Sequence, residues 1–282
     1  MSKIQIDNSI VSVRWLKENL SAENLVIFDA SMKPIGVAAN VPQAPHPYIP
    51  GSLRFDFDDV LTDHNTPLPH MMPNAEFFTE DMQKMGVNQD SAIVVYDKDG
   101  IYSSPRAWWM FRAMGHDSVA VLDGGLPAWI QAGYETVPTL GTPKGRGDFA
   151  SRPRVGLFVD AKYVLQALAD PTFSVIDARS AGRFKGQEPE PRPGLRGGHM
   201  PNSVNIPHTN VLENGRMLPA SKLKNIFEQY KDKKMIFSCG SGVTSCVVAL
   251  AAEQVGHKDL AVYDGSWTEW GQPDSGLPVE KD

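Results

Sequence analysis

One short segment near the C-terminus combines a nucleophilic side chain with two glycines, in a pattern that favours an anionic sulfur. Residues 239–246 read C-G-S-G-V-T-S-C, after one apolar run and before a second, longer one. This order predicts a strand, a tight loop and a helix, with Cys239 at the first position of the loop. Gly240 and Gly242 allow the backbone to curl so that several N–H groups and the positive end of the following helix point inward. Such a loop favours a bound anion or a thiolate, and therefore a nucleophilic Cys239.

A cysteine at the end of a strand has a second interpretation, because free Cys is among the most buried residue types. The sequence of the loop alone does not decide whether Cys239 is a nucleophile or a small core residue. Cys246 falls inside the predicted helix, and we interpret it as a packing residue. A disulfide between the two would require Cα atoms within about 7 Å, and no feature of the sequence demands one.

The composition is typical of a soluble globular protein, with 41% hydrophobic and 21% charged residues. A chain of 282 residues exceeds the usual size of one domain and predicts two. The net charge of −6 argues against a nucleic-acid or anionic-membrane partner. Two cysteines provide no disulfide framework, and neither a signal core nor a membrane-length apolar run is present. We therefore expect a cytoplasmic protein.

The sequence also repeats itself at a period the size of a domain. Gly115-His116 recurs as Gly256-His257, Asp123-Gly124 as Asp264-Gly265 and Trp129 as Trp270, each pair 141 residues apart. Apolar strands ending in Asp, at 25–29 and 173–177, extend the match. Several matches in the same order predict two homologous domains rather than a solenoid.

Short apolar strands alternate with helical segments in each copy. The predicted helices lie at 9–20, 75–85, 105–114, 221–230 and 244–255. This alternation predicts an α/β fold in which each domain has a parallel sheet flanked by helices on both faces. A stretch rich in Gly and Pro without periodicity separates the copies. We predict an N-terminal domain at 1–138, a linker at 139–155 and a C-terminal domain at 156–282.

The repeat places Asp97 where Cys239 stands in the second copy, so the first copy lacks the thiol. The N-terminal domain is therefore predicted to be catalytically silent and to supply one wall of a cleft. Such a position accords with the preference of ligand sites for domain interfaces and for the carboxyl ends of parallel strands.

Over essentially its whole length the chain resembles a known family, the tandem-domain rhodanese-type sulfurtransferases. The motifs that carry the resemblance are F-D-F-D at 55–58, P-L-P-H at 67–70, S-P-R-A-W-W at 104–109, G-R-F at 182–184, E-P-R-P-G at 190–194, G-H-M-P at 198–201, C-G-S-G-V-T at 239–244 and Y-D-G-S-W-T-E-W at 263–270. Within the family, the neutral loop is similar to that of the 3-mercaptopyruvate enzymes. Thiosulfate-using members usually carry basic residues just after the Cys.

The resemblance implies substrate-binding roles for two arginines, Arg183 in G-R-F and Arg192 in the Pro-rich loop. Mercaptopyruvate carries its carboxylate at some distance from its sulfur, so the basic groups should stand away from the nucleophile. Arg suits a carboxylate because its planar fork makes two parallel charge-assisted hydrogen bonds. The alternative is a surface Arg paired with Glu188 or Glu190. The loop residues expected to line the same substrate site are Gly240, Gly242, Val243 and Thr244.

The resemblance further implies a two-step transfer through a persulfide on Cys239, with release of pyruvate. The acceptor would be a thiol, a reduced thioredoxin-like protein or cyanide. It also implies a proton-transfer group of Ser241, His70 and an acidic residue, for which we favour Asp58 over Asp59. The histidines do not stand at metal-ligand spacings, and we expect neither a metal nor a cofactor.

Three rival functions stay open. A cysteine-dependent phosphatase on a related fold would need an Arg six residues after the Cys, where this chain has Ser245, which counts against it. A non-catalytic binding module is disfavoured because Cys239 is present. A thiosulfate:cyanide sulfurtransferase differs only in the sulfur donor, and the neutral loop argues against it as the main activity.

Overall fold

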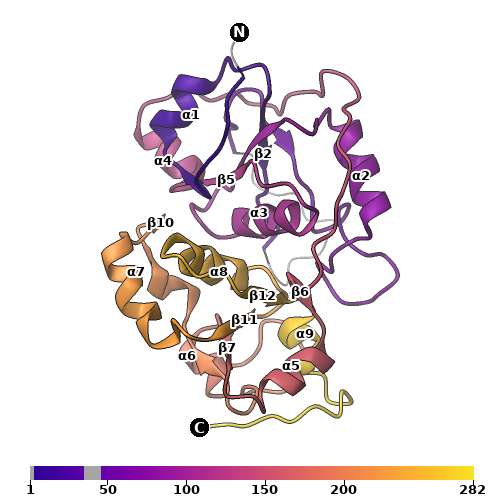
Figure 1. Ribbon diagram of the computed structural model, residues 1–282, viewed down its shortest axis with the longest axis vertical. Helices are drawn as coiled ribbons and strands as arrows, with labels where there is room; N and C mark the ends of the chain where they lie inside the picture. Colours follow the sequence, from indigo (N-terminus) through magenta and orange to yellow (C-terminus); the bar gives the residue numbers. More distant parts are fainter. Residues whose placement is uncertain (1–2, 35–45) are drawn as a thin grey trace.

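The chain folds into two α/β domains of the same topology, seen one above the other in the computed structural model (Figure 1). The structure describes residues 3–34 and 46–282; residues 1–2 and 35–45 of the predicted N-terminal domain lie outside the described residues. The N-terminal sheet has the order β1-β5-β4-β2-β3, and the C-terminal sheet β6-β12-β11-β7-β8. All neighbouring strands within these two sheets are parallel, which confirms the predicted fold class.

The strands that build the two sheets are short. In the N-terminal domain they are β1 (Ile10–Val11), β2 (Leu25–Asp29), β3 (Leu53–Arg54), β4 (Ala92–Tyr96) and β5 (Val119–Leu122). Their counterparts are β6 (Phe158–Val159), β7 (Phe173–Asp177), β8 (Val204–Asn205), β11 (Lys234–Ser238) and β12 (Leu260–Tyr263). A small antiparallel hairpin of β9 (Leu212–Glu213) and β10 (Arg216–Met217) lies outside the C-terminal sheet.

Helices cover both faces of each sheet, because the central strands alternate buried side chains between two apolar clusters. In the N-terminal domain, α1 (Val13–Asn19) and α4 (Gly125–Gln131) cover one face, and α2 (Ala75–Lys84) and α3 (Ser104–Ala113) cover the other. In the C-terminal domain, α5 (Ala161–Ala167) and α9 (Ser266–Trp270) lie opposite α7 (Ala220–Phe227) and α8 (Ser245–Gln254). The remaining helices are the short α6 (Ala181–Phe184) and the 3-10 turns η1 (His208–Val211) and η2 (Glu228–Tyr230).

The helix predicted at 9–20 was placed too early. Ile10 and Val11 instead form β1, which pairs in parallel with the end of β5. Helix α1 begins only after Ser12, whose side chain accepts a hydrogen bond of 3.1 Å from the Trp15 amide. The helix begins later than predicted for two reasons. The β-branched Ile10 and Val11 pair with β5 as a strand, and Ser12 caps the N-terminus of the helix.

The two domains share one apolar core rather than meeting at a polar interface. Helices α3 and α8 face each other between the sheets (Figure 1), and residues of both helices belong to a single buried cluster. Trp109 of α3 is buried and donates from Nε1 to the Leu157 carbonyl at 3.0 Å. Arg112 of α3 pairs with Glu253 of α8 at 3.2 Å. The domains are therefore held in a fixed relation, as a site built across them requires.

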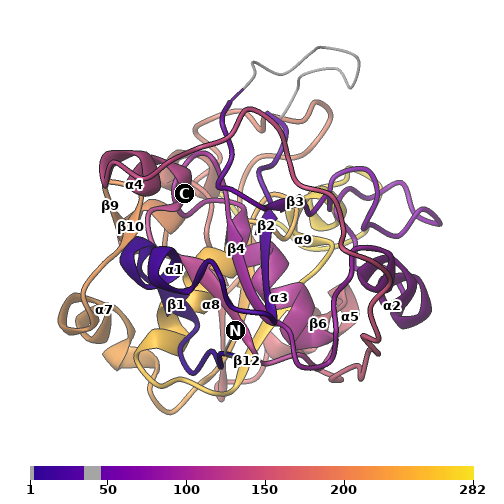
Figure 2. The ribbon, with the colours of Figure 1, turned by 90° about the horizontal axis from the view of Figure 1, so that it is seen from above.

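The segment between α4 and β6 is anchored along the N-terminal domain. Figure 2 shows it passing over β3 and α2 before it reaches β6. Gly147 donates to Gln83 at 2.8 Å and Phe149 to Val87 at 3.1 Å, with the Phe149 ring buried in the core. The predicted linker is thus anchored by these hydrogen bonds and by Phe149, although most of its residues are exposed. The boundaries 1–138, 139–155 and 156–282 stay a prediction. None of the described helices is long and apolar enough to cross a membrane.

Candidate active site

Cys239 lies at the carboxyl end of the central strand of the C-terminal sheet, directly before a loop that ends at α8. Its side chain is only 2% exposed, and its amide donates to Ser266 Oγ at 3.2 Å. Gly242 has φ +73°, and a Cβ there would come 2.9 Å from the Asp264 carbonyl oxygen. The loop therefore requires glycine at this position, because an L side chain would be both strained and too close.

Two opposing effects act on the Cys239 thiol. Burial raises its pKa, whereas hydrogen bonds from the Thr244 hydroxyl and from the Ser245 and Ser241 amides lower it, and the net shift is downward. Thr244 stands at the N-cap of α8, yet its side chain makes no capping hydrogen bond to the helix. Its hydroxyl donates a hydrogen bond to the Cys239 sulfur instead, so the loop favours a thiolate.

Cys246 has the opposite character, although it stands only seven residues further along. Burial raises the pKa of this thiol to about 12, and its Sγ donates to the Gly242 carbonyl at 3.3 Å. Both cysteines are free. The two thiols therefore differ in character, because the pKa of Cys239 is lowered and that of Cys246 is raised, so Cys239 forms a thiolate more readily.

The structure brings together the three residues predicted as a proton-transfer group, across the domain boundary. His70 Nδ1 lies 3.0 Å from Ser241 Oγ, and His70 Nε2 lies 3.1 Å from Asp58 Oδ1. Asp59 points elsewhere and pairs with Lys33 in a more exposed position. Of the two acidic candidates, it is thus Asp58 that faces the histidine. Both the histidine and the acid come from the N-terminal domain, which accords with the predicted wall of the cleft.

Both predicted arginines border the loop next to the nucleophile. A Cβ at Gly240 would lie 3.2 Å from Arg183 Nη2 and 3.8 Å from Arg192 Nη1, and Arg192 Nη2 lies 3.3 Å from Ser241 Oγ. Burial lowers the pKa of Arg192, opposed by the nearby Cys239 sulfur, and Arg192 forms no ion pair within the described residues. Arg183 does pair, through Nη2 and Glu190 at 2.5 Å. The alternative interpretation of Arg183, an ion pair with Glu190, is thus seen in the structure, and its role in substrate binding stays a prediction.

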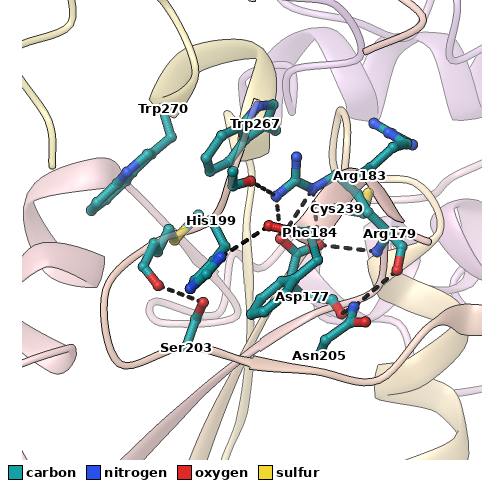
Figure 3. Close-up of polar contacts among 12 residues, drawn as sticks. Asp177, Arg179, Arg183, Phe184, His199, Ser203, Asn205, Cys239, Trp267 and Trp270 are labelled. Carbon is teal, nitrogen blue, oxygen red and sulfur yellow. Dashed lines mark hydrogen bonds and ion pairs between the residues drawn. The ribbon is translucent and has the colours of Figure 1, made fainter. Parts of the chain in front are cut away.

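Glu190 links two arginines, whereas the sequence suggested it only as an alternative partner of a surface arginine. Its side chain also accepts from Arg179 Nη1 at 2.7 Å, while Arg179 Nη2 donates to Asp177 at 2.6 Å. Figure 3 shows Asp177, Arg179 and Arg183 beside Cys239, with Trp267 nearby. The Arg179 guanidinium lies 3.9 Å from the centre of the Trp267 ring. This buried network holds Arg183 in one orientation, with part of its fork left for a ligand.

Tyr102 and His208 are two further residues of the site that sequence reasoning missed. Their rings are 5.8 Å apart, and they come from different domains. Burial raises the pKa of Tyr102, with a smaller contribution from the Cys239 sulfur, whereas the nearby Arg183 lowers it; the net shift is upward, so the phenol stays protonated. Burial likewise lowers the pKa of His208, and the neighbouring Arg183 acts in the same direction. The repeat offered one signal for Tyr102, because it belongs to the loop equivalent to the catalytic one.

That equivalent loop holds the carboxyl group of Asp97, whose pKa is raised by burial. The Asp97 carboxylate is buried and accepts from the amides of Tyr102, Ser103 and Ser104 at 3.1, 2.9 and 2.8 Å. It therefore occupies the cradle of N–H groups that the Cys239 sulfur faces in the other domain. No group of three or more potential metal ligands occurs among residues 3–34 and 46–282.

Comparison with known proteins agrees with this geometry. The family described as the Rhodanese-like domain matches residues 12–132 and 160–273, one match per domain. The chain belongs to the rhodanese family. It is 40% identical to the 3-mercaptopyruvate sulfurtransferase of Escherichia coli K12 (96% of this chain, 97% of that protein). It is 38% identical to thiosulfate/3-mercaptopyruvate sulfurtransferase 1, mitochondrial, of Arabidopsis thaliana (99% of this chain, 80% of that protein).

A solved rhodanese structure extends the agreement from sequence to fold. SseA from Escherichia coli, described as a 3-mercaptopyruvate sulfotransferase, superimposes with a TM-score of 0.82 at 35% identity. The match covers 92% of this chain and 99% of SseA. The prediction of two tandem rhodanese-like domains is thereby confirmed.

Proposed function

We propose that this rhodanese is a 3-mercaptopyruvate sulfurtransferase with Cys239 as its nucleophile. The observation that carries the proposal is a thiol of lowered pKa flanked by two guanidinium groups at Gly240. A ligand with a carboxylate at one end and a sulfur at the other fits that arrangement. The name of the Escherichia coli relative, similar over 96% of the chain, supports the same donor.

In the first step, the Cys239 thiolate attacks the sulfur of 3-mercaptopyruvate. The carbon–sulfur bond breaks, its electron pair remains on carbon as the enolate of pyruvate, and a disulfide-type S–S bond forms on the enzyme. The proton of the donor thiol ends on the methyl carbon, with Ser241, His70 and Asp58 as the proposed carriers. The products are pyruvate and a Cys239 persulfide anion, which the N–H groups of the loop stabilise.

In the second step, an acceptor takes the outer sulfur and Cys239 returns to the thiolate. A thiolate acceptor becomes a persulfide, and cyanide becomes thiocyanate. We propose that this acceptor is a thiol, on a small molecule or on a thioredoxin-like protein.

Arg183 and Arg192 are proposed to bind the donor carboxylate, and Gly240, Gly242, Val243 and Thr244 to form the walls around its sulfur. Both arginines stand outside the catalytic loop in sequence and border Gly240 in space, where they can reach the carboxylate of a donor whose sulfur meets Cys239. A second donor, thiosulfate, is favoured by one observation, the name of the Arabidopsis relative, which mentions both substrates. We propose thiosulfate as the poorer donor here, because the loop residues after Cys239 carry no charge.

Pyruvate release decides between the donors. The purified protein is expected to release pyruvate from 3-mercaptopyruvate with a thiol acceptor much faster than it forms thiocyanate from thiosulfate and cyanide. Cys239→Ser should abolish both reactions, and Cys246→Ser should preserve them. Faster turnover of thiosulfate would reverse the assignment of donor, and full activity of Cys239→Ser would refute the nucleophile.

A cytoplasmic location is also proposed, from the two free cysteines and the absence of any disulfide between them. The Arabidopsis relative is named as mitochondrial. Fractionation of cells that produce the native protein, with detection by a specific antibody, would distinguish the two compartments.

A further inference from the structure

Arg106 is a fully buried cation of the N-terminal domain that contacts both halves of the site. From α3, its Nη1 donates to the Gly242 carbonyl of the catalytic loop at 3.1 Å. Its Nη2 donates to the His70 carbonyl and to Asp264 Oδ1, the latter at 2.7 Å. The second oxygen of Asp264 accepts from the Met72 amide at 2.7 Å. One ion pair thus ties the loop that carries His70 to the domain that carries Cys239.

The backbone of His70 shows why such a tie matters. Its φ is +64°, a left-handed conformation that non-glycine residues adopt rarely and keep only where neighbours impose it. Arg106 holds the His70 carbonyl, and Asp264 holds the amide two residues later. Both contacts lie on the main chain directly after the N–Cα bond of His70 that carries the positive φ. They fix the direction in which the imidazole leaves the backbone, and therefore its 3.0 Å approach to Ser241.

The burial of Arg106 is not explained by stability alone. Replacing a buried ion pair by apolar residues of similar volume is often neutral or stabilising, because charges lose their hydration. The guanidinium lies over the Phe158 ring at 4.5 Å, but its Nε has no hydrogen-bond partner among the described residues. Burial of the Arg106 charge costs hydration and leaves Nε without a partner, while its Nη1 and Nη2 bind the segments that carry Cys239 and His70. A role in positioning these segments explains this arrangement better than stability does.

We propose that Arg106 and Asp264 are positioning residues that hold the His70 imidazole at Ser241 across the domain interface. The proposal rests on the sulfurtransferase function and adds a condition to it. The proton-transfer group is complete only while the two domains are docked through this ion pair. Neither residue touches the donor; both act through His70.

Arg106→Lys and Asp264→Asn test the proposal, because each preserves size while it removes part of the fork or its acceptor. We expect kcat for pyruvate release to fall at least about tenfold, with KM within about twofold, since the substrate arginines are untouched. The pH midpoint for alkylation of Cys239 should stay unchanged. If that midpoint rose far enough for the lost thiolate fraction to account for the whole fall in kcat, the variant would have disrupted the catalytic loop itself. That result would overturn the proposal.

The matched control is another ion pair from α3 to the C-terminal domain, Arg112 with Glu253 of α8, which lies away from the loop. Because this pair is partly exposed, Arg112→Lys and Glu253→Gln should lower the melting temperature by less than Arg106→Lys does and leave kcat nearly unchanged. If they reduced kcat as much as Arg106→Lys does, general loosening of the interface would explain the data and positioning would be rejected.

A double-mutant cycle with His70→Gln separates action through His70 from any other route. Adding Arg106→Lys to His70→Gln should slow the enzyme by less than about twofold further, because the residue it positions is already gone. Losses that multiply would overturn the proposal.

The imidazole nitrogen resonances of His70 provide a readout that needs no turnover. Arg106→Lys should move them as Ser241→Ala does, whereas Arg112→Lys should not. Unchanged resonances in Arg106→Lys would refute positioning. A wild-type protein that releases no pyruvate from mercaptopyruvate would refute the proposed function instead, and the resonances would still decide the role of Arg106.

Discussion

The thiol pKa of Cys239 depends on one hydroxyl that can be removed without changing the shape of the loop. Thr244→Val deletes the side-chain donor to the sulfur and keeps the branched outline. A hydrogen bond to a charged group contributes about 1.5–3 kcal/mol, which corresponds to about 1–2 pKa units. Burial, which raises the pKa, is then opposed only by the remaining donors, the amide and hydroxyl of Ser245 and the Ser241 amide. We therefore expect the pKa of Cys239 to rise by about 1–2 units.

The measurement is the rate of iodoacetamide alkylation between about pH 5 and about pH 10, because only the thiolate reacts. In the native protein the lowered pKa keeps the thiolate present below the pH at which an ordinary cysteine ionises. In Thr244→Val the whole curve should move to higher pH. Near neutral pH the rate then falls about 10–100-fold and recovers as the pH rises. Cys246, whose pKa is about 12, contributes little over this range.

A matched control lies beside the same loop. Thr268 is also buried, and its amide donates to the Gly240 carbonyl, but its hydroxyl donates to Gly265 at 2.8 Å and not to the sulfur. Thr268→Val should therefore leave the midpoint in place. An unchanged or lower midpoint in Thr244→Val would refute the reasoning, and equal shifts in both variants would point to packing.

Other predictions concern the charges around the loop. Arg183→Ala and Arg192→Ala should each raise KM for 3-mercaptopyruvate by about tenfold or more, the loss of a charge-assisted hydrogen bond; steady-state kinetics with an unchanged KM would return either residue to a structural role. Asp58→Asn should lower kcat about 10²-fold or more while Asp59→Asn stays near wild type, and equal activities of the two variants would remove Asp58 from the proton-transfer group. Asp97→Ala should destabilise the protein by about 3–5 kcal/mol, because several buried N–H groups lose their acceptor, and urea unfolding with a change below about 1 kcal/mol would contradict this.

Much of the fold could be predicted from local pattern. Buried parallel strands are continuous apolar runs, so β4 and β11 stand out in the sequence and are recovered as Ala92–Tyr96 and Lys234–Ser238. The order of matched positions revealed the duplication. The boundary at Ser12 escaped, because strand pairing of Ile10–Val11 with β5 depends on residues more than a hundred positions away.

Cys239 and its glycines signal their conformation locally, so this part of the site could be predicted from the residues themselves. The group of Ser241, His70 and Asp58, which meets across the domains, was expected only from the resemblance to a family. Arg106 and Asp264 escaped, because they lie 158 residues apart and each alone resembles an ordinary charged residue. The contacts of Glu190 depend in turn on how the Pro-rich loop folds within the C-terminal domain. No local pattern specifies either set of contacts.

The common core of α3 and α8 has a consequence for the history of the chain. A duplicated domain is free to be lost as long as its twin can fold and act alone. Here the helix behind the catalytic loop buries its apolar residues against the other copy, and His70 and Tyr102 come from that copy as well. Loss of the copy without the thiol would therefore remove part of the site and expose the apolar face of the helix behind the catalytic loop. The two copies have become halves of one folding and functional unit.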